Sequence, residues 1–87
     1  MFIITVYDIN EKRVNKVLKK CREYLFWVQN SVFEGELTKG QFGVFRRELL
    51  DIINKKEDSV IFYTFDSKTY TDREVIGLEK GRVDNFL

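Results

Sequence analysis

Two stretches of the chain have the pattern of inner β-strands. Residues 2–7 are β-branched or aromatic with nearly continuous apolar character, and Asp8 follows them. Such a run is typical of a strand that is covered on at least one face. A second run, from Val60 to Phe65, carries an equally high density of large apolar side chains. We therefore expect two central strands that lie side by side.

Two other segments have the 3.6-residue periodicity of helices. The first follows Asn10, a favourable N-cap, and is expected to run from about Glu11 to Tyr24. The second follows Thr38, which stands three residues before Gln41 in the capping-box spacing, and extends to about Asn54. The apolar stripes consist of Val14, Val17, Leu18, Cys21 and Leu25 in the first helix and of Phe42, Phe45, Leu49, Ile52 and Ile53 in the second.

Extended chain is expected between the two helices. Residues 27–29 and 31–37 form two short strands, and Asn30 marks a turn or bulge between them. In the second of these strands Ser31, Phe33, Gly35 and Leu37 share one side, because side chains alternate along a strand. A further short strand is expected over residues 73–78.

This order of elements predicts an α+β fold of the ferredoxin-like βαββαβ type, with residues 1–87 as a single domain. Two helices then cover one face of an antiparallel sheet, and the apolar residues on its other face need a different cover. A second copy of the chain is the simplest cover. We expect a homodimer in which the C-terminal segment, residues 66–87, packs on the partner, with the strand predicted over residues 73–78 pairing with the partner's sheet edge.

Composition narrows the class of protein. The chain of 87 residues is 44% hydrophobic, which suffices for one core and not for two. The chain has one cysteine and no histidine, so it cannot form an intramolecular disulfide and lacks the usual ligands of a structural zinc site. This composition is consistent with a reducing cytoplasm. The apolar start is too short to span a bilayer and lacks a preceding basic region, so we expect a cytoplasmic protein without a membrane partner.

The net charge of +1 gives no indication of a nucleic-acid partner by itself. Any nucleic-acid-binding surface must therefore come from a local cluster of basic residues. Lys12 and Lys16 lie on the first predicted helix, opposite its apolar stripe. They are candidates for sequence-independent contacts to a nucleic-acid backbone. The alternative is an ordinary solvated helix face. No base-reading motif is visible.

Several motifs together resemble one family. They are the strand end Val6-Tyr7-Asp8, the pair Arg13-Val14, the block of residues 28–37, the triplet Asp58-Ser59-Val60 and the tail residues 77–81 and 84–85. This sequence is similar to the family of the second Cas protein, the small ferredoxin-like subunit of spacer acquisition in CRISPR antiviral defence. The resemblance covers nearly the whole chain, and its most specific part is the block from Gln29 to Leu37.

The resemblance implies homodimers whose sheets face one another and whose C-terminal segments are exchanged. It also implies two roles that need different residues. The first is a metal-dependent endonuclease acting on RNA or double-stranded DNA. The second is a non-catalytic, DNA-binding scaffold that bridges two dimers of the CRISPR integrase subunit. A toxin-like ribonuclease or a small-molecule module on the same fold is a third possibility, and the block of residues 29–37 argues against the small-molecule version.

Asp8 is the candidate metal ligand and catalytic residue. Phosphodiester hydrolysis needs charge stabilisation at phosphorus and an activated water, which Mg²⁺ or Mn²⁺ supplies through oxygen ligands. A two-fold axis near the strand end would bring the partner's Asp8 alongside, and the resemblance assigns the family's metal-binding aspartate to this position. The alternative for Asp8 is a helix cap.

Three further residues complete the candidate site. Ser31 is a candidate for positioning a water or phosphate through its hydroxyl. Arg13 is a candidate phosphate contact, with an exposed salt bridge as its alternative. Phe33 is a candidate for packing a base or sugar, with a place in the core as its alternative.

The tail residues Glu79, Val83, Asp84, Phe86 and Leu87 either add to a sheet edge of the integrase or pack within the dimer.

Overall fold

The structure is a computed structural model that describes residues 1–66 and 71–79. Its elements follow the predicted order and confirm the α+β, ferredoxin-like fold. They are β1 (Phe2–Asp8), α1 (Glu11–Tyr24), β2 (Phe26–Gln29), β3 (Val32–Glu36), α2 (Lys39–Ile52), β4 (Ser59–Phe65) and β5 (Thr71–Gly77).

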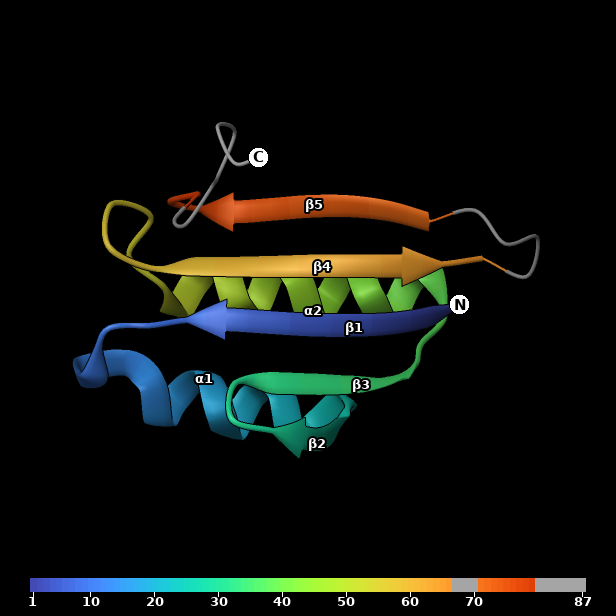
Figure 1. The fold of residues 1–87 in the computed structure, drawn as a ribbon, viewed down its shortest axis with the longest axis horizontal. Helices are drawn as coiled ribbons and strands as arrows, with labels where there is room; N and C mark the ends of the chain where they lie inside the picture. The colour runs from blue at the N-terminus through green and yellow to red at the C-terminus, as the bar shows by residue number, and fades with distance from the viewer. Residues whose placement is uncertain (67–70, 80–87) are drawn as a thin grey trace, which may run out of the picture.

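The strands of the described residues form one antiparallel sheet in the order β2-β3-β1-β4-β5. β1 and β4 occupy central positions and pair over their full lengths, from Phe2 opposite Phe65 to Asp8 opposite Ser59. Both helices lie on one side of this sheet (Figure 1). The prediction that the two apolar strands are central neighbours is therefore confirmed.

The fifth strand differs from the expectation in its partner. A strand was predicted over residues 73–78, and β5 occupies Thr71–Gly77. It pairs with β4 of the same chain, from Thr71 opposite Phe65 to Gly77 opposite Ser59. Exchange of this segment with a second copy stays a prediction, and residues 80–87 of the expected tail lie outside the described residues.

Local capping sets the helix ends. The Asn10 side chain accepts a hydrogen bond from the Lys12 N–H, so α1 begins where the sequence predicted. Thr38 and Gln41 form the predicted capping box at the start of α2. α2 ends at Ile52, two residues early, because Ile53 is an extended C-cap, and the next N–H, that of Asn54, donates to the Asp58 carboxylate instead of to a helix carbonyl. Neither helix has the length and apolar character needed to cross a membrane.

The core fills the space between the helices and the sheet. Both predicted stripes are confirmed, with Val17 and Cys21 from α1 and Phe45 and Leu49 from α2 fully buried. Burial raises the pKa of the Cys21 thiol to about 12, so this group stays protonated and unreactive.

The opposite face of the sheet carries an apolar surface that neither helix covers. Its apolar residues alternate with the core residues along β1, β3, β4 and β5 and are each half-buried, whereas the charged residues on the same face, Asp8, Glu34, Glu36 and Arg73, are exposed. We call this surface the open face; its apolar members are Phe2, Ile4, Val6, Val32, Ile61, Tyr63, Phe65 and Val75. The rings of Phe2 and Phe65 lie 6.0 Å apart on it.

Candidate functional site

Asp8 is the last residue of β1 and is exposed. Because side chains alternate along a strand, Asp8 lies on the open face, on the same side of β1 as Val6. The N-cap of α1 is Asn10, whose side chain accepts a hydrogen bond from the Lys12 N–H. Among the described residues no group of three or more acidic, histidine or cysteine side chains is placed to hold a metal ion. Asp8 as a metal ligand therefore stays a prediction.

Ser31 lies in the tight turn between β2 and β3, at the same end of the sheet as Asp8. Its carbonyl oxygen accepts a hydrogen bond of 3.1 Å from the Tyr7 N–H, one residue before Asp8. The turn depends on Asn30, whose φ of 43° lies in the left-handed region. The indole N–H of Trp27 donates to the Asn30 carbonyl over 3.0 Å and closes the turn. The fold thus brings two predicted site residues, 31 and 8, to one end of β1.

Arg13 is engaged within the protein. Its Nε donates to Oδ2 of Asp58 over 2.6 Å, and a terminal nitrogen donates to Glu57 over 2.7 Å. These bonds raise the pKa of Arg13 above its ordinary value. The salt-bridge alternative for Arg13 is thus present, although its main partner is buried rather than exposed. A contact to phosphate stays a prediction.

Asp58 is the polar residue that the sequence reasoning missed. Its side chain is fully buried, and it accepts hydrogen bonds of 2.8 Å from the backbone N–H groups of Asn10 and Asn54 as well as those from Arg13. Burial opposes its ionisation, but the bonds from Arg13 and the two N–H groups outweigh burial and lower its pKa from 3.8 to about 2. The sequence analysis names Asp58 only as part of a family motif, and the charged residues before it, Lys55 to Glu57, gave no sign of this burial.

Phe33 lies in the core. Its ring is fully buried on the helix side of the sheet and stacks on Tyr7 with ring centroids 6.2 Å apart. This placement corresponds to the packing alternative. Phe33 therefore contributes to the support under the end of β1 rather than to the exposed surface of this protomer.

Lys12 and Lys16 lie on the exposed face of α1. No ion pair involves either of them in the described part of the chain. Lys20, one turn further along, instead pairs with Glu23 and Glu48. The start of α1 thus presents two exposed cations close to the chain segment that carries Asp8.

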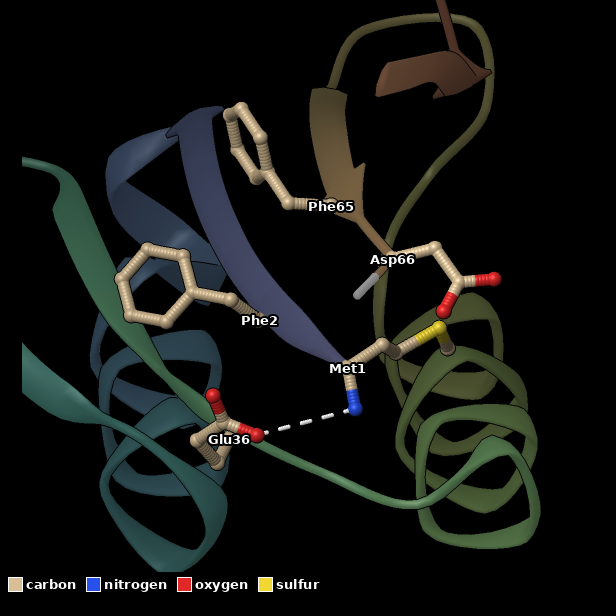
Figure 2. A pocket seen from close by; sticks show the side chains of 5 residues that line it. All are labelled: Met1, Phe2, Glu36, Phe65 and Asp66. Atoms are coloured by element: carbon tan, nitrogen blue, oxygen red, sulfur yellow. Dashed lines mark ion pairs between the residues drawn. The ribbon is translucent and has the colours of Figure 1, made fainter. Parts of the chain in front are cut away.

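A cavity of about 350 Å³ lies at the opposite end of β1 from Asp8 (Figure 2). It is lined by Met1, Phe2, Glu36, Phe65 and Asp66. The Met1 ammonium group donates to the Leu37 carbonyl over 2.9 Å and pairs with Glu36 at 3.6 Å. None of the predicted catalytic residues borders this cavity.

Comparison with known proteins places these observations in a family. Residues 1–73 match the family model described as CRISPR associated protein Cas2. The chain is 52% identical over 87 residues to the CRISPR-associated endoribonuclease Cas2 of Thermotoga maritima, covering 100% of this chain and 99% of the relative. It is 48% identical to the protein of that name from Dictyoglomus turgidum, with 100% of both chains covered.

Solved structures agree with this result. A crystal structure of Cas2 matches with a TM-score of 0.74 and 45% identity, covering 100% of this chain and 98% of the other. The Streptococcus pyogenes Cas2 structure at pH 6.5 matches with a TM-score of 0.69 and 38% identity, covering 76% of this chain and 87% of the other. A predicted resemblance, a matching family model and full-length relatives lead to one conclusion: this chain belongs to the Cas2 family of CRISPR-associated proteins.

Proposed function

We propose that the chain is a metal-dependent endonuclease of the CRISPR adaptation system that hydrolyses phosphodiesters of RNA or double-stranded DNA as a homodimer. The observation that carries this proposal is the position of Asp8, an exposed carboxylate at the end of a central strand, on the same sheet face as a continuous apolar surface. The relatives in T. maritima and D. turgidum are named endoribonucleases, which supports the same activity.

The open face supports the proposed dimer. Val32, Val6, Ile61 and Val75 form one apolar row across four adjacent strands, and Ile4, Tyr63, Phe2 and Phe65 continue it along β1 and β4. The charged residues of this face, Glu34 and Glu36 on β3, Arg73 on β5 and Asp8 at the end of β1, lie around these apolar residues. Contiguous apolar surface of this kind is stabilised by burial against a partner. A second copy with the same face meets this need by an isologous contact. Such a contact also lets Asp8 of each protomer approach a common axis.

The metal proposal depends on this pairing. The carboxylate oxygens of Asp8 suit Mg²⁺ or Mn²⁺, and the partner's Asp8 supplies a second ligand of the same chemistry. When bound, the ion stabilises negative charge on the phosphate and activates a water. The chain's own residues then have separate tasks: Asp8 holds the ion, the Ser31 hydroxyl orients the phosphate, and Lys12 and Lys16 bind the backbone of the nucleic acid.

The test is the Asp8→Ala variant, assayed on single-stranded RNA and on double-stranded DNA with Mg²⁺ and with Mn²⁺. We expect cleavage to fall at least about 100-fold, since the residue touches the reacting centre. The variant should keep the fold and the molar mass of the wild type, because Asp8 is exposed. Asp51→Ala removes another exposed carboxylate, from α2, and serves as the matched control. Equal cleavage by Asp8→Ala and wild type would refute the catalytic role.

A second function, a DNA-binding scaffold that bridges integrase dimers, is favoured by the two exposed cations at the start of α1. Contacts to phosphates through Lys12 and Lys16 need no metal and no chemistry. Spacer acquisition in cells separates the two functions. Acquisition that persists in Asp8→Ala cells but is lost in a Lys12→Gln/Lys16→Gln strain supports the scaffold, whereas loss in Asp8→Ala cells supports the enzyme.

A further inference from the structure

The segment that carries Asp8 is held at both of its ends by the dipeptide Asp58-Ser59. At one end, Asp8 is the strand partner of Ser59 at the limit of the β1–β4 ladder. At the other end, two residues later, the Asn10 N–H donates to Oδ1 of Asp58 over 2.8 Å. Only Ile9 lies between these two attachments. The direction of the strand-to-helix turn is therefore set by residues that stand about fifty positions later in the chain.

Asp58 is itself fixed from several directions. Its carboxylate also accepts from the Asn54 N–H at the end of α2 and from Arg13 on α1. Its carbonyl oxygen accepts a bond of 2.7 Å from the Leu78 N–H, just after β5. The end of β1, the turn before β4 and the end of β5 all meet at one end of the sheet (Figure 1). Because these donors come from separate elements, the carboxylate has little freedom to move.

We propose that Asp58 is the positioning residue of the Asp8 site. Its buried carboxylate holds the turn from Asp8 to Asn10 so that the Asp8 side chain keeps a fixed direction on the open face, and Arg13 supplies the countercharge that keeps the carboxylate in place. This inference rests on the proposed function of Asp8 and adds to it a residue that touches neither the metal nor the nucleic acid.

The hydrogen bonds around Asp58 explain why an asparagine side chain cannot replace the aspartate. An ionised aspartate has two oxygens that only accept hydrogen bonds, and here every partner is a donor. In Asp58→Asn, one oxygen becomes an NH₂ group that must face donors in a buried place. The turn must then shift to relieve an unsatisfied buried contact.

The experiment compares wild type, Asp58→Asn and Glu74→Gln. Glu74→Gln is the matched control, because it also converts a carboxylate paired with an arginine into an amide, but on β5 against Arg46 of α2. Mn²⁺ affinity is measured by titration calorimetry on folded dimer, and the exchange of the Asp8 and Asn10 amide hydrogens is followed by NMR. We expect Mn²⁺ binding to weaken roughly tenfold or more in Asp58→Asn and less than about twofold in Glu74→Gln. Exchange should accelerate at both amides only in Asp58→Asn.

The possible results separate the two proposals. Mn²⁺ binding that is lost in Asp8→Ala but unchanged in folded Asp58→Asn would overturn the positioning role and leave the proposed function intact. Mn²⁺ binding that is absent in wild type or insensitive to Asp8→Ala would overturn both. If Asp58→Asn does not fold, Arg13→Met carries the test, since it removes the countercharge and leaves both backbone bonds to Asp58. It should weaken Mn²⁺ binding a few-fold, and unchanged affinity in that variant would equally refute the proposal.

Discussion

Arg13 on α1 and Asp58 before β4 form an ion pair across 45 residues of sequence, with Nε 2.6 Å from Oδ2. The Asp58 side chain has no exposed surface, and that of Arg13 is 20% exposed. A pair of this kind is costly to disrupt from one side, because the remaining charge stays buried without its partner. The contact therefore links the beginning of α1 to the beginning of β4 at the end of the sheet where Asp8 lies.

The pH dependence of stability should reveal this pair. The pKa of Asp58 is lowered from 3.8 to about 2, which corresponds to about 2 kcal/mol of stability. Because the folded-state pKa is the lower one, this contribution is complete above about pH 4 and is lost as the pH falls toward 2. We expect the free energy of unfolding, measured by urea titration, to fall more steeply over this range in wild type than in Asp58→Asn. Identical slopes in the two proteins would contradict the assignment.

Gly77 should tolerate no side chain. Its φ of 86° lies in the left-handed region, and a Cβ built there would come within 2.3 Å of the Asp58 carbonyl oxygen. Gly77→Ala should therefore destabilise the protein by about 2 kcal/mol or more, as measured by chemical denaturation. Gly43 is the contrasting control, because a Cβ there meets nothing within 4 Å. Gly43→Ala should stabilise α2 by about 0.5–1 kcal/mol, and a similar loss in both variants would refute this explanation.

The open face should be the dimer interface. Ile61 lies in its middle, between Val6 and Val75 of the neighbouring strands. Ile61→Lys places a charge in the centre of the contact, and we expect the molar mass in solution at micromolar concentration to fall to that of a monomer. Val28→Lys, on the exposed edge strand β2, should leave the dimer unchanged. A wild-type protein that is monomeric under these conditions would remove the basis for a shared Asp8 site.

Lys12 and Lys16 should contribute to nucleic-acid binding through contacts to backbone phosphates, independently of base sequence. Replacing both by Gln should weaken binding to double-stranded DNA of unrelated sequences by a similar factor. The slope of log affinity against log salt concentration should become shallower by about 2, one unit for each lost phosphate contact. Lys39→Gln, an exposed change at the start of α2, is the control and should leave the slope unchanged. An unchanged slope in the double variant would assign these lysines to an ordinary solvated helix face.

The sequence by itself determined the elements and their faces. Asn10 and the Thr38–Gln41 pair set the helix starts, and the apolar periodicity assigned Val17, Cys21, Phe45 and Leu49 to the core. These features are readable because capping and periodicity depend on residues within a few positions of one another. The same patterns placed Asp8 at the end of a central strand and indicated that the second sheet face is apolar.

Only the tertiary structure decided how distant residues combine. It joined Arg13 to Asp58, buried Phe33 against Tyr7 and paired β5 with β4 of its own chain. No local pattern encodes these contacts, because each depends on how separate elements are brought together by the sheet. Packing decides whether a charged residue faces solvent or is buried against a partner 45 positions away. For this reason the sequence of the turn before β4 did not reveal that Asp58 is buried and held by several hydrogen bonds.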